Sequence, residues 1–216
     1  MLPPRSKVAP VIHYAALDWR DAPAFMAELW AREGMGARAL QFAILTGARS
    51  GEVRGAQWSE IDLERAQWTI PAERMKAGQP HRVPLSEAAL AILHAMAKLK
   101  DGAGLVFIGQ RRGTPMSDMT LTAVLRRIGK GDLTAHGFRS RFRDWAAEAT
   151  AHPNHVVEQA LARAIPSAVE AAYRRGDFLV KRRALMDDWA AYLAKPTAQV
   201  VRPQFGKQHV AHEVVA

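Results

Sequence analysis

Along most of the chain, apolar residues recur every three or four positions, which is the spacing of helices that bury one face. The first such stretch begins at Asp21, where Pro23 favours a helix start, and is expected to run to about Arg32. Its apolar face is formed by Phe25, Leu29 and Trp30. The pattern therefore predicts an amphipathic helix at the beginning of the folded region.

A second helix is predicted over residues 35–46 and is apolar enough to lie at the centre of the protein. Thr46 and Gly47 close it, because glycine readily ends a helix. Ser50 is expected to cap a short third helix that runs to Gly55.

Short apolar runs then replace the helical spacing. They cover residues 61–63, 67–70 and 82–85, and Gly78 and Pro80 lie between the last two. Runs of this length, bounded by turn residues, predict a small antiparallel sheet.

Helical spacing returns after the sheet, interrupted at residues 105–108, which are expected to form a short strand or a buried loop. The further helices are expected from Ser86 to about Leu99, from Ser117 to Ile128, from Thr134 onward, and as three helices over 153–194 broken at Pro166 and Gly176–Asp177. The predicted fold class is mainly α with a small antiparallel β-sheet (α+β).

The two ends of the chain lack periodicity. Residues 1–20 contain Pro3, Pro4 and Pro10 with scattered charge, so we expect them to be the remnant of a linker. Residues 21–195 are predicted to form one folded domain, and residues 196–216 to form a C-terminal tail.

Composition narrows the class of protein. With 49% hydrophobic and 24% charged residues, the 216-residue chain reads as a soluble globular protein. It has no apolar run near the roughly 20 residues of a membrane span and no signal peptide, so we expect no membrane partner. The lack of cysteine excludes disulfides and thiolate metal sites and fits a reducing cytoplasm.

The chain is basic, with 30 Lys and Arg against 21 Asp and Glu and a net charge of +9. A surplus of this size favours an anionic partner such as nucleic acid. A basic protein that simply prefers arginine has the same composition, so charge alone leaves both interpretations open.

The segment HGFRSRFRDW, residues 136–145, combines cations with aromatic residues. If Thr134 caps the helix, His136 and Arg139 lie three apart on one face near its N-terminus, a place that suits an anion. The other face is expected to be core and carries Phe138, Phe142, Trp145 and Ala149. Taken alone, this spacing is also common on plain surface helices.

Three further segments carry candidate chemistry. In TGARSGEVRG, Glu52 can pair with Arg49 and hold its guanidinium fork in place. Lys76 lies at the tip of the predicted hairpin, and Tyr173 precedes two arginines in VEAAYRRGD. Each has an ordinary alternative: a surface ion pair, a solvated turn, and an interface or core tyrosine.

Taken in order, TGARSGEVRG, ERMKAGQPHRVPLS, HGFRSRFRDW and VEAAYRRGDFLVKRR resemble the catalytic domain of tyrosine recombinases, the phage-type integrases, within their genomic-island and satellite-phage branch. The resemblance covers roughly residues 21–195. It implies the tyrosine recombinase catalytic-domain fold and site-specific DNA recombination through a 3′-phosphotyrosyl intermediate, with no cofactor and no metal.

The resemblance also implies a role for each matching residue. Arg49 and Arg139 are expected to bind the scissile phosphate, with Glu52 supporting Arg49 and His136 completing the His-x-x-Arg pair. Lys76 is expected to protonate the leaving 5′-oxygen. The nucleophile is expected to be Tyr173.

One position departs from the family pattern. Arg163 stands ten residues before Tyr173 (173 − 163), where the family usually has histidine and sometimes tryptophan. Arginine still donates hydrogen bonds to a phosphate oxygen, but it is longer and does not lose its proton. We therefore count Arg163 among the candidate catalytic residues.

The expected partner is double-stranded DNA in the bacterial cytoplasm, at the nucleoid, bound by a chain that is a monomer alone and a tetramer on DNA. The C-terminal helix, 178–194, and the tail are expected to dock on a neighbouring protomer. The N-terminal DNA-binding domains of such integrases are expected to be absent. Candidate backbone contacts are Arg126, Arg127, Lys130, Arg141, Arg143, Arg174 and Arg175.

Three alternatives remain. The chain could be a truncated DNA-binding remnant whose cleavage is impaired or lost, as Arg163 suggests. A type IB topoisomerase shares the chemistry, although the spacing follows the integrases more closely. A basic helical domain without a DNA role would require all four segments to be coincidental.

Overall fold

The computed structural model describes residues 17–99, 102, 104–111, 113–163 and 176–196. Its α-helices are α1 (Ala22–Trp30), α2 (Met35–Thr46), α3 (Ser50–Arg54), α4 (Glu87–Ala97), α5 (Thr120–Arg127), α6 (Ala135–Ala149), α7 (Asn154–Ala160) and α9 (Leu179–Leu193). Short 3-10 helices are η1 (Trp19–Asp21), η2 (Trp58–Glu60) and η3 (Ala72–Arg74), and the strands are β1 (Ile61–Asp62), β2 (Gln67–Ile70) and β3 (His81–Pro84). The predicted class, mainly helical with one small antiparallel sheet, is confirmed.

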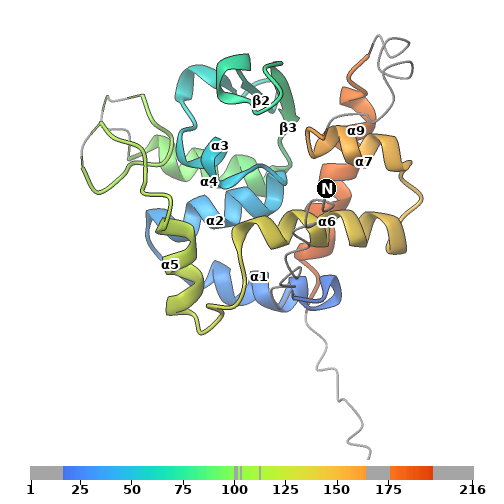
Figure 1. Ribbon diagram of the computed structural model, residues 1–216, viewed down its shortest axis with the longest axis horizontal. Helices are drawn as coiled ribbons and strands as arrows, with labels where there is room; N and C mark the ends of the chain where they lie inside the picture. Colours follow the sequence, from blue (N-terminus) through green and yellow to red (C-terminus); the bar gives the residue numbers. More distant parts are fainter. Residues whose placement is uncertain (1–16, 100–101, 103, 112, 164–175, 197–216) are drawn as a thin grey trace, which may run out of the picture.

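Helix α2 lies at the centre, with the sheet on one side and α1 on the other (Figure 1). Its buried residues run almost without a break from Ala37 to Thr46 and include the polar Gln41. The Gln41 amide donates to the carbonyl of Leu29 (2.8 Å), so the polar group is satisfied inside the core. Gly47 ends the helix in the left-handed region (φ 60°), as its sequence predicts.

The sheet is a three-stranded antiparallel meander in the order β1-β2-β3. Trp68 pairs with Ile61 on one side and Val83 on the other, and its ring packs 5.4 Å from that of Phe42 on α2. Leu105 forms only an isolated bridge to Gln57, so residues 105–108 are a buried loop.

Some helix starts differ from those predicted. The N-cap position of α3 is occupied by Arg49 and not by Ser50, because the carboxylate of Glu52, at the third helical position, accepts the backbone N–H of Arg49 and so fixes the helix start one residue earlier. Helix α5 begins three residues after Ser117, whose hydroxyl accepts from the N–H of Met119. Thr134 caps α6 as predicted, accepting from the N–H of Gly137 (3.0 Å).

Helix α9 packs within its own protein. Trp189 is fully buried between Phe142 and Trp145 of α6 and donates to the carbonyl of Ile44 on α2 (2.9 Å). Much of the apolar face of α9 is thus covered within its own protein, although Val180 is exposed; docking of this helix on a neighbour stays a prediction. The tail lies outside the described residues from residue 197 onward.

No helix among the described residues is long and apolar enough to cross a membrane. The same part of the chain contains no group of three or more His, Asp or Glu side chains that could hold a metal ion.

Candidate active site

Arg49 is held at the start of α3 by a buried carboxylate. One oxygen of Glu52 accepts the Arg49 backbone N–H and the other contacts its Nη1, each at 2.7 Å. Glu52 is only 5% exposed and Arg49 29% exposed, so the pair is partly shielded from water. The guanidinium is fixed by its own turn, as its spacing from Glu52 predicts.

Arg139 lies on α6 and is 4% exposed. Its Nη1 donates to the carbonyl of Gly47 and its Nη2 to that of Leu161 (2.6 Å). The pKa of Arg139 is lowered to about 10, mainly by burial and also by the charges of Arg49 and Arg163, while the charge of Glu52 opposes the shift. Its buried Nε–H finds no acceptor within the described part of the chain.

The two arginines meet at the C-terminal end of α7. Arg49 donates from Nη2 to the carbonyl of Ala162 (3.1 Å), next to the Leu161 carbonyl that Arg139 binds. Carbonyls at a helix C-terminus carry partial negative charge and lack partners within the helix, so guanidinium groups are favourable there. Segments that are far apart in sequence are thereby joined at one point.

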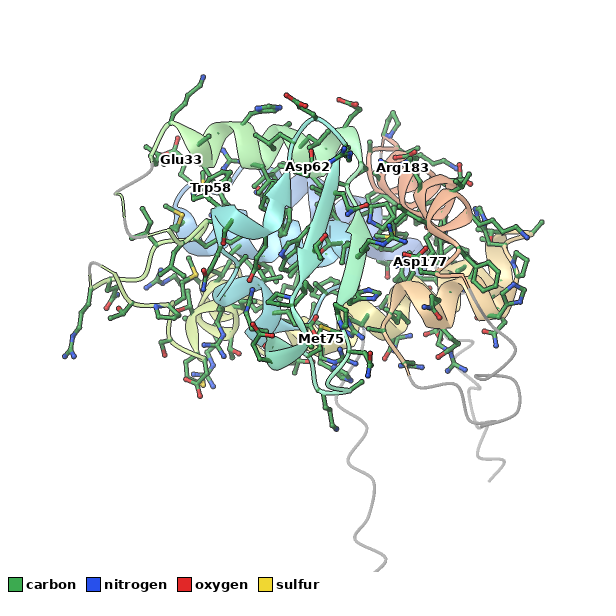
Figure 2. The ribbon with its side chains drawn as sticks, turned by 90° about the horizontal axis from the view of Figure 1, so that it is seen from above. Glu33, Trp58, Asp62, Met75, Asp177 and Arg183 are labelled. Atoms are coloured by element: carbon green, nitrogen blue, oxygen red, sulfur yellow. The ribbon has the colours of Figure 1, made fainter. Side chains whose placement is uncertain are left out.

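A solvent-facing cleft of about 570 Å³ opens beside this junction. It is lined by Arg49, Ser50, Gly51, Glu52, Glu73, Arg74, Met75, Lys76 and His136. Lys76 is exposed in the turn after η3, next to Met75 at one end of the sheet (Figure 2). The structure therefore brings Arg49, Lys76 and His136 to a single surface.

His136 is exposed in the first turn of α6. Desolvation lowers its pKa below the ordinary 6.5, and the charges of Arg139, Arg163 and Arg49 lower it further. At neutral pH the ring is therefore uncharged and can accept a proton.

Arg163 follows α7 and belongs to the same cationic group, since its charge acts on both His136 and Arg139. Its Nη1 lies 3.6 Å from a carboxylate oxygen of Glu158, which also pairs with Nε of Arg143 at 2.7 Å. Tyr173, Arg174 and Arg175 lie outside the described residues.

The predicted DNA-contact residues are in different environments. Arg126 and Arg127 are exposed near the end of α5, Lys130 is half-buried, and Arg127 lines a separate cavity near the start of α2. Arg141 pairs with Asp144 (2.9 Å).

The core face of α6 is largely as predicted, since Phe138, Phe142 and Trp145 are buried. The expected core position of Ala149 is wrong, because the last turn of α6 leaves this residue exposed.

Sequence reasoning missed two residues of this region. Arg74 lines the cleft, pairs with Glu60 and donates to the carbonyl of Glu52; its only signal was its position two residues before Lys76. His81 on β3 has its pKa lowered to about 4, mainly by burial and also by Arg182 and Arg49, while hydrogen bonding to the backbone of Ala160 and the charge of Glu52 oppose the shift.

The sequence pattern of the phage integrase family matches residues 20–178. The chain belongs to this family. The prophage integrase IntA of Escherichia coli (strain K12) is 41% identical over 149 residues, which cover 68% of this chain and 36% of that protein. The integrase of Enterobacteria phage P4 is 34% identical over 200 residues, which cover 84% of this chain and 46% of the phage protein.

Among solved structures, a lambda integrase tetramer bound to a Holliday junction has a TM-score of 0.53 and 17% identity, covering 81% of this chain and 52% of that one. This likeness shows a shared fold, and with the family match it confirms the predicted architecture of a tyrosine recombinase catalytic domain. The chain spans less than half the length of the two curated integrases.

Proposed function

We propose that this chain performs site-specific DNA recombination, cutting and rejoining strands through a 3′-phosphotyrosyl intermediate. The observation that supports this most strongly is the cleft shared by Arg49, Lys76 and His136, with Arg139 buried beside Arg49. Membership of the phage integrase family supports the same chemistry.

In the proposed reaction, the Tyr173 oxygen attacks the phosphorus of a phosphodiester. A P–O bond to tyrosine forms, the bond to the 5′-oxygen breaks, and the phenol proton passes to neutral His136. Lys76 supplies a proton to the departing 5′-oxygen. Negative charge that grows on the nonbridging oxygens is stabilised by Arg49 and Arg139, which the fold holds in place beforehand.

The phosphoester is retained in the protein–DNA link, so the 5′-hydroxyl of another strand can reverse the step on a new partner. Rejoining therefore consumes no nucleotide, and no cofactor or metal has a part in the proposal. Arg163 is proposed to contact a phosphate oxygen from the side of α7, in the place of the usual histidine.

Double-stranded DNA is the proposed partner, bound at the bacterial nucleoid. The net charge of +9 and the exposed Arg126 and Arg127 support backbone binding. By analogy with the lambda integrase tetramer on a Holliday junction, the chain is proposed to be a monomer alone and a tetramer on DNA. Sedimentation with and without DNA measures both states.

The test is covalent capture on a library of nicked duplexes with a randomised core. The nick lets the short fragment beyond the cut diffuse away, so the adduct accumulates and is recovered under denaturing conditions. We expect an adduct with the wild-type chain and none with Tyr173→Phe. Tyr192→Phe is the matched control, because among the described residues the Tyr192 hydroxyl donates to the carbonyl of Trp19 (3.1 Å), away from the cleft.

Two results would contradict the proposal. An adduct that persists in Tyr173→Phe would place the nucleophile elsewhere. If only the Arg163→His variant reacts while the wild-type chain binds DNA without cutting it, this chain is the impaired remnant; the comparisons do not favour that alternative.

A further inference from the structure

A buried arginine on α9 holds the chain just after the proposed nucleophile. Arg182 is 1% exposed and donates from Nε to the carbonyl of Asp177 (2.6 Å) and from Nη2 to its Oδ2 (2.9 Å). From Nη1 it donates to the carbonyl of Arg82 on β3 (2.5 Å). One guanidinium thus ties Asp177, through backbone and side chain, to the edge of the sheet.

Asp177 is held by other groups as well. The same Oδ2 accepts from Nε of Arg82 (2.7 Å), and Oδ1 accepts from the N–H of Leu179 at the start of α9. Figure 2 shows Asp177 beside the β3 edge of the sheet. The next residue, Phe178, has a left-handed backbone (φ 52°), a conformation that persists only where the surroundings impose it.

Burying the guanidinium of Arg182 costs desolvation energy, so its place in the fold calls for an explanation. Burial lowers the pKa of Arg182, Asp177 opposes this shift, and the charge of Arg82 adds to it, so two like charges share one carboxylate. Apolar residues would fill the same space without desolvating a cation. What the arginine adds is a fixed position for Asp177.

That position matters because Asp177 lies four residues after Tyr173. Four residues span at most about 14 Å, so a fixed Asp177 limits where the phenol can be. Before the segment, the carbonyls of Leu161 and Ala162 are held by Arg139 and Arg49. The described residues on either side of 164–175 are therefore held at both ends, before the gap by Arg139 and Arg49 and after it by Arg182.

We propose that Arg182 and Asp177 are positioning residues for the nucleophile: they anchor the C-terminal end of the segment that carries Tyr173 so that its hydroxyl meets the phosphate at the arginines. The inference rests on the proposed function, and it deepens it by assigning a role to two residues outside the cleft.

The test compares two neighbouring arginines of α9. Arg182→Met removes the anchor, whereas Arg183→Met removes a guanidinium that donates to the carbonyls of Arg65 and Ala66 at the far side of the sheet. In Figure 2, Arg183 lies toward Asp62 and away from Met75. Both variants lose one charge and one set of carbonyl contacts, but Arg182 is buried and also pairs with Asp177, so their rates are compared only under conditions where both variants are folded.

The readout is single-turnover adduct formation on a captured duplex, at temperatures where circular dichroism shows each variant folded. For Arg182→Met we expect the maximal rate to fall about 10- to 100-fold, as a small misplacement of reacting groups does, with the half-saturating protein concentration unchanged. Arg183→Met should keep the wild-type rate. Asp177→Asn should follow Arg182→Met, and Arg182→Lys should recover part of the rate.

A 5′-bridging phosphorothiolate substrate distinguishes a defect in positioning the nucleophile from a defect in protonating the leaving group. The sulfur leaves as a thiolate and needs no proton. On it, Lys76→Ala should regain its rate and Arg182→Met should stay slow. Equal rates for the two α9 variants, or rescue of Arg182→Met by sulfur, would overturn the inference.

If the wild-type chain forms no adduct, the proposed function fails. Amide hydrogen exchange then tests separately whether Arg182 holds the chain at Asp177. Peptides that end at Phe178 should then exchange faster in Arg182→Met than in Arg183→Met. Equal exchange in the two variants would remove the basis for an anchor.

Discussion

Glu52 uses both carboxylate oxygens to hold Arg49, one on the backbone N–H and one on the side chain. In Glu52→Gln the amide oxygen can replace only one of these acceptors, and the charge is lost. We expect the free energy of unfolding to fall by about 1.5–3 kcal/mol, the range for hydrogen bonds to charged groups, as measured by urea denaturation. Adduct formation should slow as well, since Arg49 loses its support.

The control is Asp62→Asn, which removes an ion pair with the exposed Arg65 at 3.0 Å in the β1–β2 turn. Water screens this pair, so we expect no measurable change in stability. Equal losses in the two variants would mean that the burial of Glu52 does not matter.

His136 determines the acidic limit of the proposed reaction. Its pKa lies below the ordinary 6.5, and the ring must be neutral to accept the tyrosine proton. The rate should therefore stay high as pH falls through 6.5 and drop only at the lower pKa of the folded protein. A profile of single-turnover rate against pH, with His136→Gln as reference, measures this limit.

Desolvation is the main cause of that shift in the pKa of His136, and Arg163→Gln tests one of the smaller, electrostatic contributions. Removing one of the positive charges that act on His136 raises the pKa of the ring, so the acidic limit should move to higher pH. An NMR titration of the imidazole in both proteins gives the same comparison without DNA. An unchanged titration would show that Arg163 does not act on the ring.

At the scale of elements, two polar residues at N-cap positions differ in what they bind. Thr134 accepts a hydrogen bond from Gly137 at the start of α6, whereas the buried hydroxyl of Ser86 at the start of α4 finds no partner within the described residues. Thr134→Ala should cost about 1 kcal/mol and Ser86→Ala less than about 0.5 kcal/mol in thermal unfolding. A larger loss at Ser86 would mean that its hydroxyl has a partner.

The helices and strands were largely readable from the sequence because hydrophobic spacing reflects burial. The central helix over residues 35–46 and the Thr134 cap were correct for this reason. The starts of α3 and α5 were not, because short-range hydrogen bonds decided them: Glu52 accepts the backbone N–H of Arg49 and makes Arg49 the N-cap of α3, and the hydroxyl of Ser117 binds the N–H of Met119 in a turn before α5.

The sequence predicted those contacts of the candidate site whose two side chains lie close together in the chain, as Arg49 and Glu52 do. Arg74, His81 and Arg182 were not found, because their partners include backbone groups of distant segments, such as the carbonyls of Glu52 and Arg82. Backbone acceptors have no residue signature, so only the fold reveals such contacts.

At the scale of the whole molecule, the surplus of positive charge (+9) should make DNA affinity depend on salt concentration. The logarithm of the binding constant should fall linearly with the logarithm of salt concentration, with a slope of about 0.9 for each phosphate contact. Arg126→Gln should reduce this slope by about 1 in fluorescence anisotropy titrations.

Arg65→Gln is the control for Arg126→Gln, because it removes the same charge at another place on the surface. Arg65 is exposed in the β1–β2 turn, close to Asp62 at the opposite end of the sheet from Met75 (Figure 2). Its removal should leave the slope unchanged. If both variants lower the slope equally, binding follows total charge and no defined face is involved.

Arg139 joins the end of α2 to the end of α7 inside the protein. A lineage that no longer needed to cut DNA could not discard this residue without also losing its architecture. Decay is therefore expected to begin at the solvent-facing rim, at positions such as Lys76 or Arg163, long before it reaches the interior. Related proteins that still fold but no longer cut DNA should still carry the buried guanidinium.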